Sequence, residues 1–112
     1  MNIEFCMQDT TLIVILAGEI DHHTSVEIRE TVDREYQKRR ARNILFDFEK
    51  VVFMDSSGIG LLMGRYRTVS ICGGYVGLYN VSPKVDQILS ISGIYKLTRL
   101  YESREHAFKC LA

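Results

Sequence analysis

Two patterns of hydrophobic and polar positions alternate along the chain, one typical of strands and the other typical of helices. Strands are predicted at residues 3–7, 11–17, 43–48, 75–79 and 95–101. Helices are predicted at residues 22–41, from within 53–58 to about 69, from 82 to 92, and after Ser103 with Ala107, Phe108 and Leu111 on one side. The order β-β-α-β-α-β-α-β-α predicts an α/β domain with a mostly parallel mixed sheet, in which the opening hairpin supplies the antiparallel edge.

The second predicted strand is the most apolar part of the chain. Thr11–Ala17 is hydrophobic almost without interruption, which is typical of a central strand buried on both faces. Function in parallel sheets gathers where the strands reach their carboxyl ends. Gly18–Asp21 and Met54–Gly58 would both emerge there, so we expect these two loops to be neighbours. The helix between them should be buried along Ile28, Val32 and Tyr36.

The central helix carries two apolar stripes. At about 100° per residue, one stripe predicts the core and consists of Ile59, Leu62, Met63, Tyr66 and Val69. On the opposite side, Gly60, Leu61, Gly64 and Thr68 lie close to Ser57. Two glycines inside a helix each cost about 1 kcal/mol relative to alanine, so this second stripe needs a reason. The spacing leaves two interpretations open: close approach of a partner, with Leu61 pointing outward, or an internal helix packed tightly against its own protein.

The start of this helix carries Asp55, Ser56 and Ser57. Aspartate and serine are preferred N-cap residues, because their side-chain oxygens accept hydrogen bonds from the first free N–H groups. The other interpretation is that one serine caps the helix while the next offers its hydroxyl to solvent. A phosphate on that hydroxyl would be stabilised by the free N–H groups and the helix dipole, so the modified chain could stay folded.

Charge and composition narrow the possible partners. The chain has 112 residues, with 14 basic and 14 acidic side chains and no net charge, which suits one domain spanning residues 1–112. Without a net field, we expect neither nucleic acid nor membrane as a partner. The basic run at residues 38–42 follows the acids of the same helix and lies where cations favour a helix end.

The residues that bind metals or form disulfides are scattered. Cys6, Cys72 and Cys110 are odd in number and far apart, so they predict reduced thiols and a cytoplasmic protein. We expect neither a secretory leader nor a membrane-spanning run. The three histidines, at positions 22, 23 and 106, predict no ligand cluster. We therefore expect no metal or cofactor, and a monomer when the chain is free.

Known catalytic motifs fit poorly. Gly58-Ile59-Gly60 begins like a dinucleotide fingerprint but has Met63 at the third glycine position, and neither a phosphate loop nor a nucleophile elbow is present. We therefore do not expect an enzyme. A receiver-like domain, in which Asp55 itself accepts the phosphate, is a different possibility. It would need magnesium held by clustered acids, and Glu19 and Asp21 are not the adjacent acidic pair that it requires.

Four segments in order carry a resemblance to a known family. They are Gly18–His23, the run Phe53–Gly60 continued by Gly64–Arg67, Ser82–Pro83, and Ser92–Gly93. With them the chain resembles STAS domains, and among these the anti-sigma-factor antagonists of endospore formation. The resemblance covers the whole chain and implies the STAS fold.

The resemblance also implies a partner switch controlled by phosphorylation. The phosphorylated serine would be Ser57. The unphosphorylated chain would bind an anti-sigma factor, a serine kinase, in its ADP form and release the sigma factor; the kinase with ATP would inactivate the chain, and a PP2C-type phosphatase would restore it. The expected partner surface comprises Ile20, Asp21, Asp55, Ser56, Ser57, Gly58, Gly60, Leu61 and Gly64. The competing interpretation is a STAS interaction module that is never phosphorylated.

Overall fold

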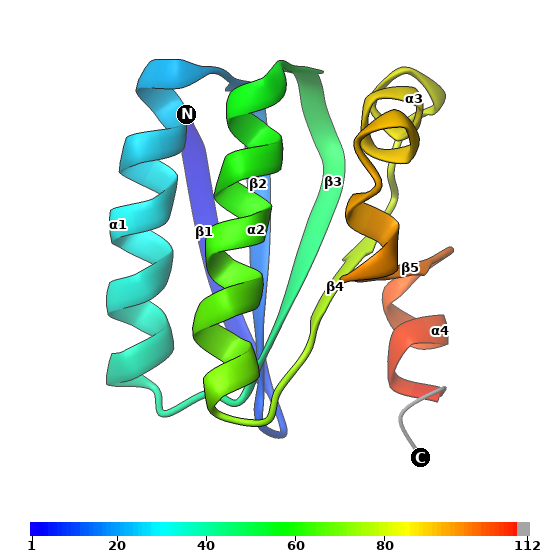
Figure 1. Cartoon of the computed structure of the whole chain (residues 1–112). Coiled ribbons are helices and arrows are strands. Elements are labelled where there is room, and N and C mark those ends of the chain that lie inside the picture. Colours follow the sequence, from blue (N-terminus) through cyan, green and yellow to red (C-terminus); the bar gives the residue numbers. More distant parts are fainter. Residues whose placement is uncertain (110–112) are drawn as a thin grey trace.

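The computed structural model describes residues 1–109, which form one layer of strands with helices packed on it (Figure 1). The strands are β1 (Asn2–Gln8), β2 (Thr11–Ile20), β3 (Asn43–Met54), β4 (Val76–Tyr79) and β5 (Arg99–Tyr101). The helices are α1 (His22–Lys38), α2 (Ser56–Ile71), α3 (Pro83–Ser92), the short 3₁₀ helix η1 (Ile94–Lys96) and α4 (Arg104–Lys109). The predicted order of elements is confirmed, and η1 is the only addition within the described residues.

The sheet keeps the strands in sequence order, β1-β2-β3-β4-β5. β1 pairs antiparallel with β2, and every later pair is parallel, so the predicted mostly parallel sheet with one antiparallel edge is confirmed. β2 and β3 stay paired up to Ile20 opposite Met54. This register places the ends of β2 and β3 side by side, as expected for two neighbouring loops.

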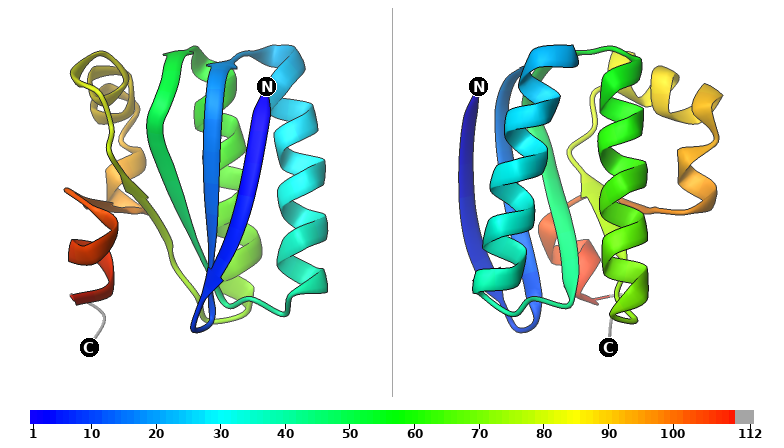
Figure 2. Two further views of the ribbon diagram at one scale, coloured as in Figure 1. Left: turned by 180° about the vertical axis from the view of Figure 1, so that it is seen from behind. Right: turned by 60° about the vertical axis from the view of Figure 1, so that its left-hand side comes forward.

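The helices α1 and α2 lie on one face of the sheet, and α4 lies on the other (Figure 2). Right-handed crossovers between strands that follow one another in order place successive helices on the same face. The main core lies beneath these helices and includes the predicted α1 stripe Ile28, Val32 and Tyr36. A smaller cluster beneath α4 includes Ile13, Leu45, Tyr79, Tyr101 and Ala107. β2 therefore contributes to both clusters, as its apolar run predicted.

Several element ends differ from the prediction. β3 extends to Met54 instead of ending at residue 48, because its partner β2 also extends, to Ile20, and the two strands continue to pair. β2 bends on the way at Gly18, whose φ of 122° favours glycine. The last predicted strand, 95–101, shortens to Arg99–Tyr101, because Ile94 turns into the core and forms η1. The predicted apolar position Leu111 lies outside the described residues, as does Cys110.

None of the helices in residues 1–109 has the length and the hydrophobicity that a membrane span requires.

Gly74 holds the turn between α2 and β4, and its replacement should destabilise the fold. A Cβ atom at this position would overlap the backbone carbonyl oxygen of Arg42. We expect Gly74→Ala to lower the free energy of unfolding by about 2–4 kcal/mol, because backbone has to move. Urea unfolding of both proteins measures the difference. Gly60→Ala is the control: it has open space around it and should raise the free energy of unfolding by about 0.5–1 kcal/mol. Equal stability of the two variants would contradict this account.

Candidate functional site

The candidate site lies where β3 passes into α2. The N-cap of α2 is Asp55, and its carboxylate accepts a hydrogen bond from the Ser57 N–H at 2.8 Å. The Asp55 N–H donates to the carbonyl of Ile20 at 3.1 Å, which ties the start of α2 to the end of β2. The cap is therefore the aspartate alone, and both serines lie within the first helical turn. The hydroxyls of Ser56 and Ser57 are left for other partners.

Ser57 is partly exposed, and its hydroxyl makes no hydrogen bond to another residue in the range 1–109. Ser56, one position earlier, is exposed. The first turn of α2 contains no acidic side chain, so the carboxylate at the positive end of the helix dipole is that of the N-cap Asp55. An anion attached to Ser57 would lie at this end of the helix, where the helix dipole favours negative charge.

The neighbouring loop is built in a similar way. Asp21 caps α1 in a capping box, where its carboxylate accepts hydrogen bonds from the N–H groups of His23 and Thr24, each at 2.9 Å. The Thr24 N–H is the main reason why the pKa of Asp21 is lowered, because it stabilises the ionised form. Asp21 is thus an anionic and partly exposed group beside the start of α2.

A groove between α1 and α2, here called the α1–α2 groove, opens beside Ser57. Its volume is about 430 Å³. On the α2 side the groove is lined partly by serine and glycine, whose small side chains leave it open. Two arginines contribute positive charge to it. The lining residues are His22, Ser25, Val26, Arg29, Ser57, Gly60, Leu61, Gly64 and Arg65. The α1 residues were not predicted as part of the site, because the spacing within α2 describes the faces of that helix alone.

Gly60 and Gly64 lie in open surroundings. A Cβ atom placed on either glycine would meet no heavy atom within 4 Å outside the neighbouring backbone of α2. Internal packing therefore does not require glycine at these positions, which removes the interpretation of a helix pressed against its own protein there. Gly58 is different, since its Cβ would overlap the side chain of Met54. The three glycines of α2 thus divide into one that the fold needs and two that leave a surface bare.

Three of the residues expected at the partner surface are buried. Ile20 is completely buried, Leu61 is 5% exposed, and Gly58 is also buried. The expectation that Leu61 points outward is wrong, because α1 packs against that side of α2 and covers it. Ile20 packs inward at the end of β2 as part of the main core. The accessible members of the expected set are Asp21, Asp55, Ser56, Ser57, Gly60 and Gly64.

The predicted core stripe of α2 is also displaced. Leu62 and Val69 are buried as expected, whereas Ile59 and Tyr66 are only partly buried and Met63 is 36% exposed. The buried face comprises Gly58, Leu61, Leu62, Arg65 and Val69, which is rotated from the prediction by roughly a quarter turn at about 100° per residue. α1 and the sheet together cover this face. Hydrophobic spacing missed the rotation because a glycine and an arginine belong to the buried set.

Arg65 is the buried charge of the site. It is 5% exposed, and its Nε lies 2.8 Å from a carboxylate oxygen of Asp33 on α1. Both Nε and Nη1 are buried without a hydrogen-bond partner in the described residues, so the contact with Asp33 is an ion pair only. Burial lowers the pKa of Arg65, and Asp33 opposes this by favouring the charged form. The spacing of four from Leu61 and again to Val69 is the signal that could have placed Arg65 on the buried face.

A second groove reaches the start of α2 from its other side. It lies between α2 and α3, has a volume of about 390 Å³, and is almost entirely apolar in its exposed atoms. Its lining residues are Asp55, Ser56, Ile59, Ile88, Ile91 and Ser92. Ile91 is 82% exposed, so a large apolar side chain of this groove is open to solvent. The start of α2 is therefore flanked by an apolar groove on one side and the cation-bearing α1–α2 groove on the other.

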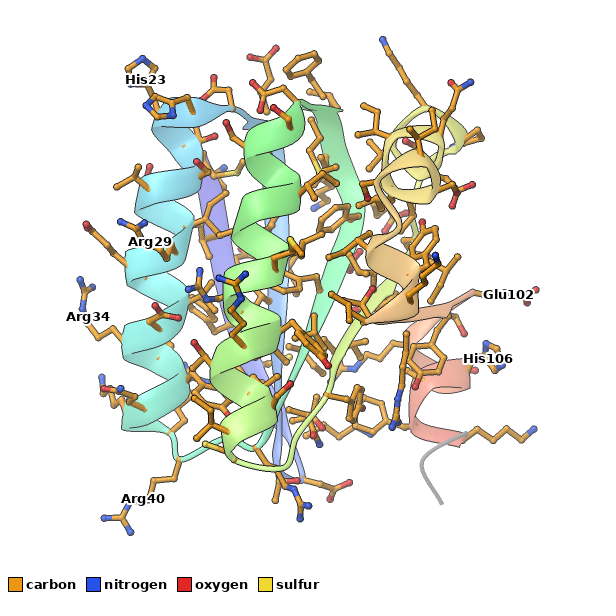
Figure 3. All side chains as sticks on the ribbon, in the orientation of Figure 1. His23, Arg29, Arg34, Arg40, Glu102 and His106 are labelled. Atoms are coloured by element: carbon orange, nitrogen blue, oxygen red, sulfur yellow. The ribbon has the colours of Figure 1, made fainter. Side chains whose placement is uncertain are left out.

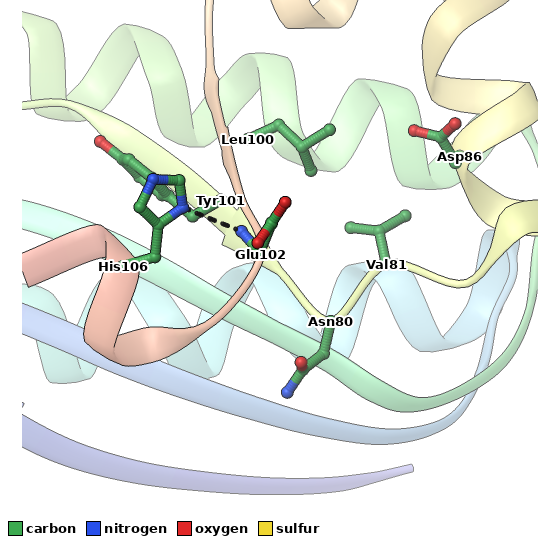
Figure 4. A pocket seen from close by; sticks show the side chains of 7 residues that line it. All are labelled: Asn80, Val81, Asp86, Leu100, Tyr101, Glu102 and His106. Carbon is green, nitrogen blue, oxygen red and sulfur yellow. Dashed lines mark hydrogen bonds between the residues drawn. The ribbon is translucent and has the colours of Figure 1, made fainter. Parts of the chain in front are cut away.

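A further pocket lies at the ends of β4 and β5 and shares no residue with either groove (Figure 4). Its volume is about 480 Å³. His106 faces Glu102, whose backbone N–H donates to the ring Nδ1 at 3.3 Å. Among residues 1–109, no three His, Cys, Asp or Glu side chains are placed to hold a metal ion, here or elsewhere.

The fold and the site together define a small α/β domain that presents a helix start between two grooves. The STAS domain family matches residues 2–107. The anti-sigma F factor antagonist of Paenibacillus polymyxa is 37% identical over 109 residues, which cover 96% of this chain and 93% of the relative. The chain therefore belongs to the STAS domain family and, within it, to the anti-sigma factor antagonists, which are regulatory binding modules.

Two solved structures match closely over the whole chain. The anti-sigma factor antagonist SpoIIAA in its unphosphorylated form has a TM-score of 0.84 and 31% identity, and the match covers 98% of this chain and 96% of that one. The Bacillus cell fate determinant SpoIIAA in its phosphorylated form has a TM-score of 0.75 and 29% identity, and the match covers 99% of this chain and 100% of that one. The expected STAS fold is confirmed.

The ion pair between Arg65 and Asp33 should contribute to stability. Asp33→Asn would leave a buried guanidinium without its carboxylate, which is strongly destabilising when both partners are buried. Asp33 is itself partly exposed, so we expect a smaller loss of about 1–2 kcal/mol in the free energy of unfolding. Glu27→Gln, an exposed acid on the same helix, is the matched control and should change stability by less than about 0.5 kcal/mol. Equal values for the two variants would show that the pair is not stabilising.

Proposed function

We propose that this chain is an anti-sigma factor antagonist controlled by phosphorylation of Ser57. In its unphosphorylated form it binds the anti-sigma factor, a serine kinase, with ADP bound, and the sigma factor is released. The same kinase with ATP phosphorylates Ser57, and a PP2C-type phosphatase removes the phosphate. The observation that carries the proposal is the accessible Ser57 hydroxyl, which has no partner within residues 1–109 and lies at the start of α2 between two grooves.

The relatives support both parts of this proposal. The similar protein of Paenibacillus polymyxa is described as an antagonist of the anti-sigma F factor. The similar SpoIIAA has been solved in an unphosphorylated and a phosphorylated form. The same backbone therefore accommodates a phosphate in that relative, and the corresponding fold of this chain offers a suitable hydroxyl at a helix N-terminus.

The proposed partner surface consists of the accessible residues around this hydroxyl. They are Asp21, Asp55, Ser56, Ser57, Gly60 and Gly64. Because Gly60 and Gly64 have open space above them, a partner's backbone can approach α2 closely along this line. Ile20, Gly58 and Leu61 would act from beneath, by holding the two loops and α2 in place. The apolar groove beside Ser56 would extend the contact toward α3.

The switch needs only a local change of charge. A phosphoserine carries about −1.5 to −2 charges at neutral pH. Placed in the middle of the contact, this charge has to be desolvated or meets like charge on the partner, and either effect weakens binding by several kcal/mol. The positive end of the α2 dipole would meanwhile stabilise the phosphate in the free chain. No refolding is required for the phosphorylated form to lose its partner.

Ser57→Ala should abolish phosphorylation and leave the fold intact. Incubated with the anti-sigma factor kinase and ATP, the wild type should gain the mass of one phosphate, and Ser57→Ala should gain none. Ser56→Ala is the matched control, because Ser56 is the exposed neighbour in the same turn, and it should still be modified. The phosphate should be stable in acid and labile in alkali. Phosphate retained on Ser57→Ala would rule out the site, and acid-labile phosphate would indicate Asp55 instead.

Ser57→Asp should weaken binding to the anti-sigma factor in the presence of ADP. One fixed carboxylate imitates part of the phosphate charge, and we expect the dissociation constant to rise by about 10- to 100-fold. Ser70→Asp places the same charge at an exposed position in the last turn of α2 and should change the constant by less than about threefold. Calorimetric titration measures both variants. An unchanged constant for Ser57→Asp would contradict the charge mechanism.

A further inference from the structure

The α1–α2 groove carries positive charge that the chain does not balance. None of its lining residues is acidic, whereas two of them are arginines, Arg29 and Arg65. α2 itself contains no aspartate or glutamate, although basic and acidic residues are equal in number over the whole chain. The acidic group that lies against the groove from α1 is Asp33, which pairs with Arg65. Along the groove, two guanidinium groups therefore face one carboxylate, and the further carboxylates, Asp21 and Asp55, lie at the helix starts beside Ser57.

Part of this positive charge belongs to Arg65, which is buried in the wall of the groove. Guanidinium groups remain protonated in proteins, so a buried arginine needs partners for its N–H groups. Asp33 forms an ion pair with Nε at 2.8 Å, but neither Nε nor the buried Nη1 has a hydrogen-bond partner in the described chain. Arg29 lies close enough to disfavour the charged form of Arg65. Arg29 itself forms no ion pair with any residue from 1 to 109.

We propose that the α1–α2 groove binds a carboxylate-bearing segment of the anti-sigma factor, with Arg29 as the residue that recognises the carboxylate. This inference rests on the proposed function and names the chemistry of its partner. Arg29 offers a planar set of N–H donors that matches a carboxylate, and the uncompensated side of Arg65 adds to the same field. Gly60 and Gly64 allow the segment's backbone to lie against α2, since nothing occupies the space above them.

The same groove explains how phosphate on Ser57 would act on binding. Ser57 lines the groove together with Arg29, so a phosphate there would bring negative charge to the place where the partner's carboxylate is held. Like charges would oppose one another, and the cations of the groove would be partly neutralised by the chain's own phosphate. Arg29 and phosphorylation should therefore act on one contact, and their effects on binding should not add.

The test measures binding of the full chain to the anti-sigma factor of its own organism, with ADP present, at 50 mM and 500 mM salt. At low salt, Arg29→Gln should bind about five- to tenfold more weakly than the wild type. The difference should shrink to about twofold at high salt, because exposed charges are then screened. Arg29→Lys keeps the charge and should retain most of the affinity. Arg34→Gln is the matched control, an exposed arginine of α1 that does not line the groove (Figure 3), and should stay within twofold.

Each result decides the inference. If Arg29→Gln binds as Arg34→Gln does while the wild type binds normally, the groove does not recognise a carboxylate and the proposed function is unaffected. A loss that is the same at both salt concentrations, or that Arg29→Lys does not rescue, would also overturn the inference, because the effect would not be electrostatic. If the wild type itself does not bind the anti-sigma factor, the proposed function fails and the inference fails with it. Thermal unfolding of each variant verifies that all are folded.

Discussion

The continued pairing of β2 with β3 is the constraint on which the site depends. The two strands remain in register up to Ile20 and Met54, and the Asp55 N–H then donates to the Ile20 carbonyl. This bond fixes the start of α2 next to the start of α1. Because both helices begin at the same edge of the sheet and pack on the same face, the groove between them follows from the connection. The Ser57 hydroxyl and the α1 side chains meet only because the strands end together.

The glycines of α2 separate what the fold needs from what the surface needs. Gly58 is required by the side chain of Met54, whereas Gly60 and Gly64 have free space around them. A helix that keeps glycine at two unconstrained positions gives up about 1 kcal/mol at each. Under the proposed function, the open space at these glycines would admit the backbone of a partner along α2. Stability and recognition thus make opposite demands on neighbouring turns of one helix.

The two sides of the proposed contact differ in polarity and charge. Toward α3 the surface is apolar, with Ile91 exposed, and it can contribute binding energy through burial of hydrophobic area. Toward α1 the surface carries Arg29 and Arg65 without equal negative charge, and it can select a partner by charge. A phosphate on Ser57 lies between these surfaces. A phosphate at this single position can therefore weaken binding at both surfaces without any change of fold.

The sequence by itself determined the order of elements, the mixed sheet and the neighbouring loops, because apolar period and turn residues act over short stretches of chain. It also predicted the stripe of Ile28, Val32 and Tyr36, where every member is apolar. The resemblance to the STAS family carried the assignment of Ser57, which local spacing had left open between capping and exposure. The N-cap in the structure is Asp55, which is one of the three residues considered at the start of this helix.

Only the tertiary structure decided which side of α2 is buried. The chosen face contains Gly58 and Arg65, and no hydrophobicity pattern selects a glycine and an arginine for the interior. The packing of α1 and the carboxylate of Asp33 make that face favourable, and both come from a distant part of the chain. The burial of Leu61 and Ile20, and the meeting of Arg29 with Ser57 in one groove, follow from the same packing. Such contacts depend on how two helices lie against a sheet. The spacing of residues within either helix does not predict that arrangement.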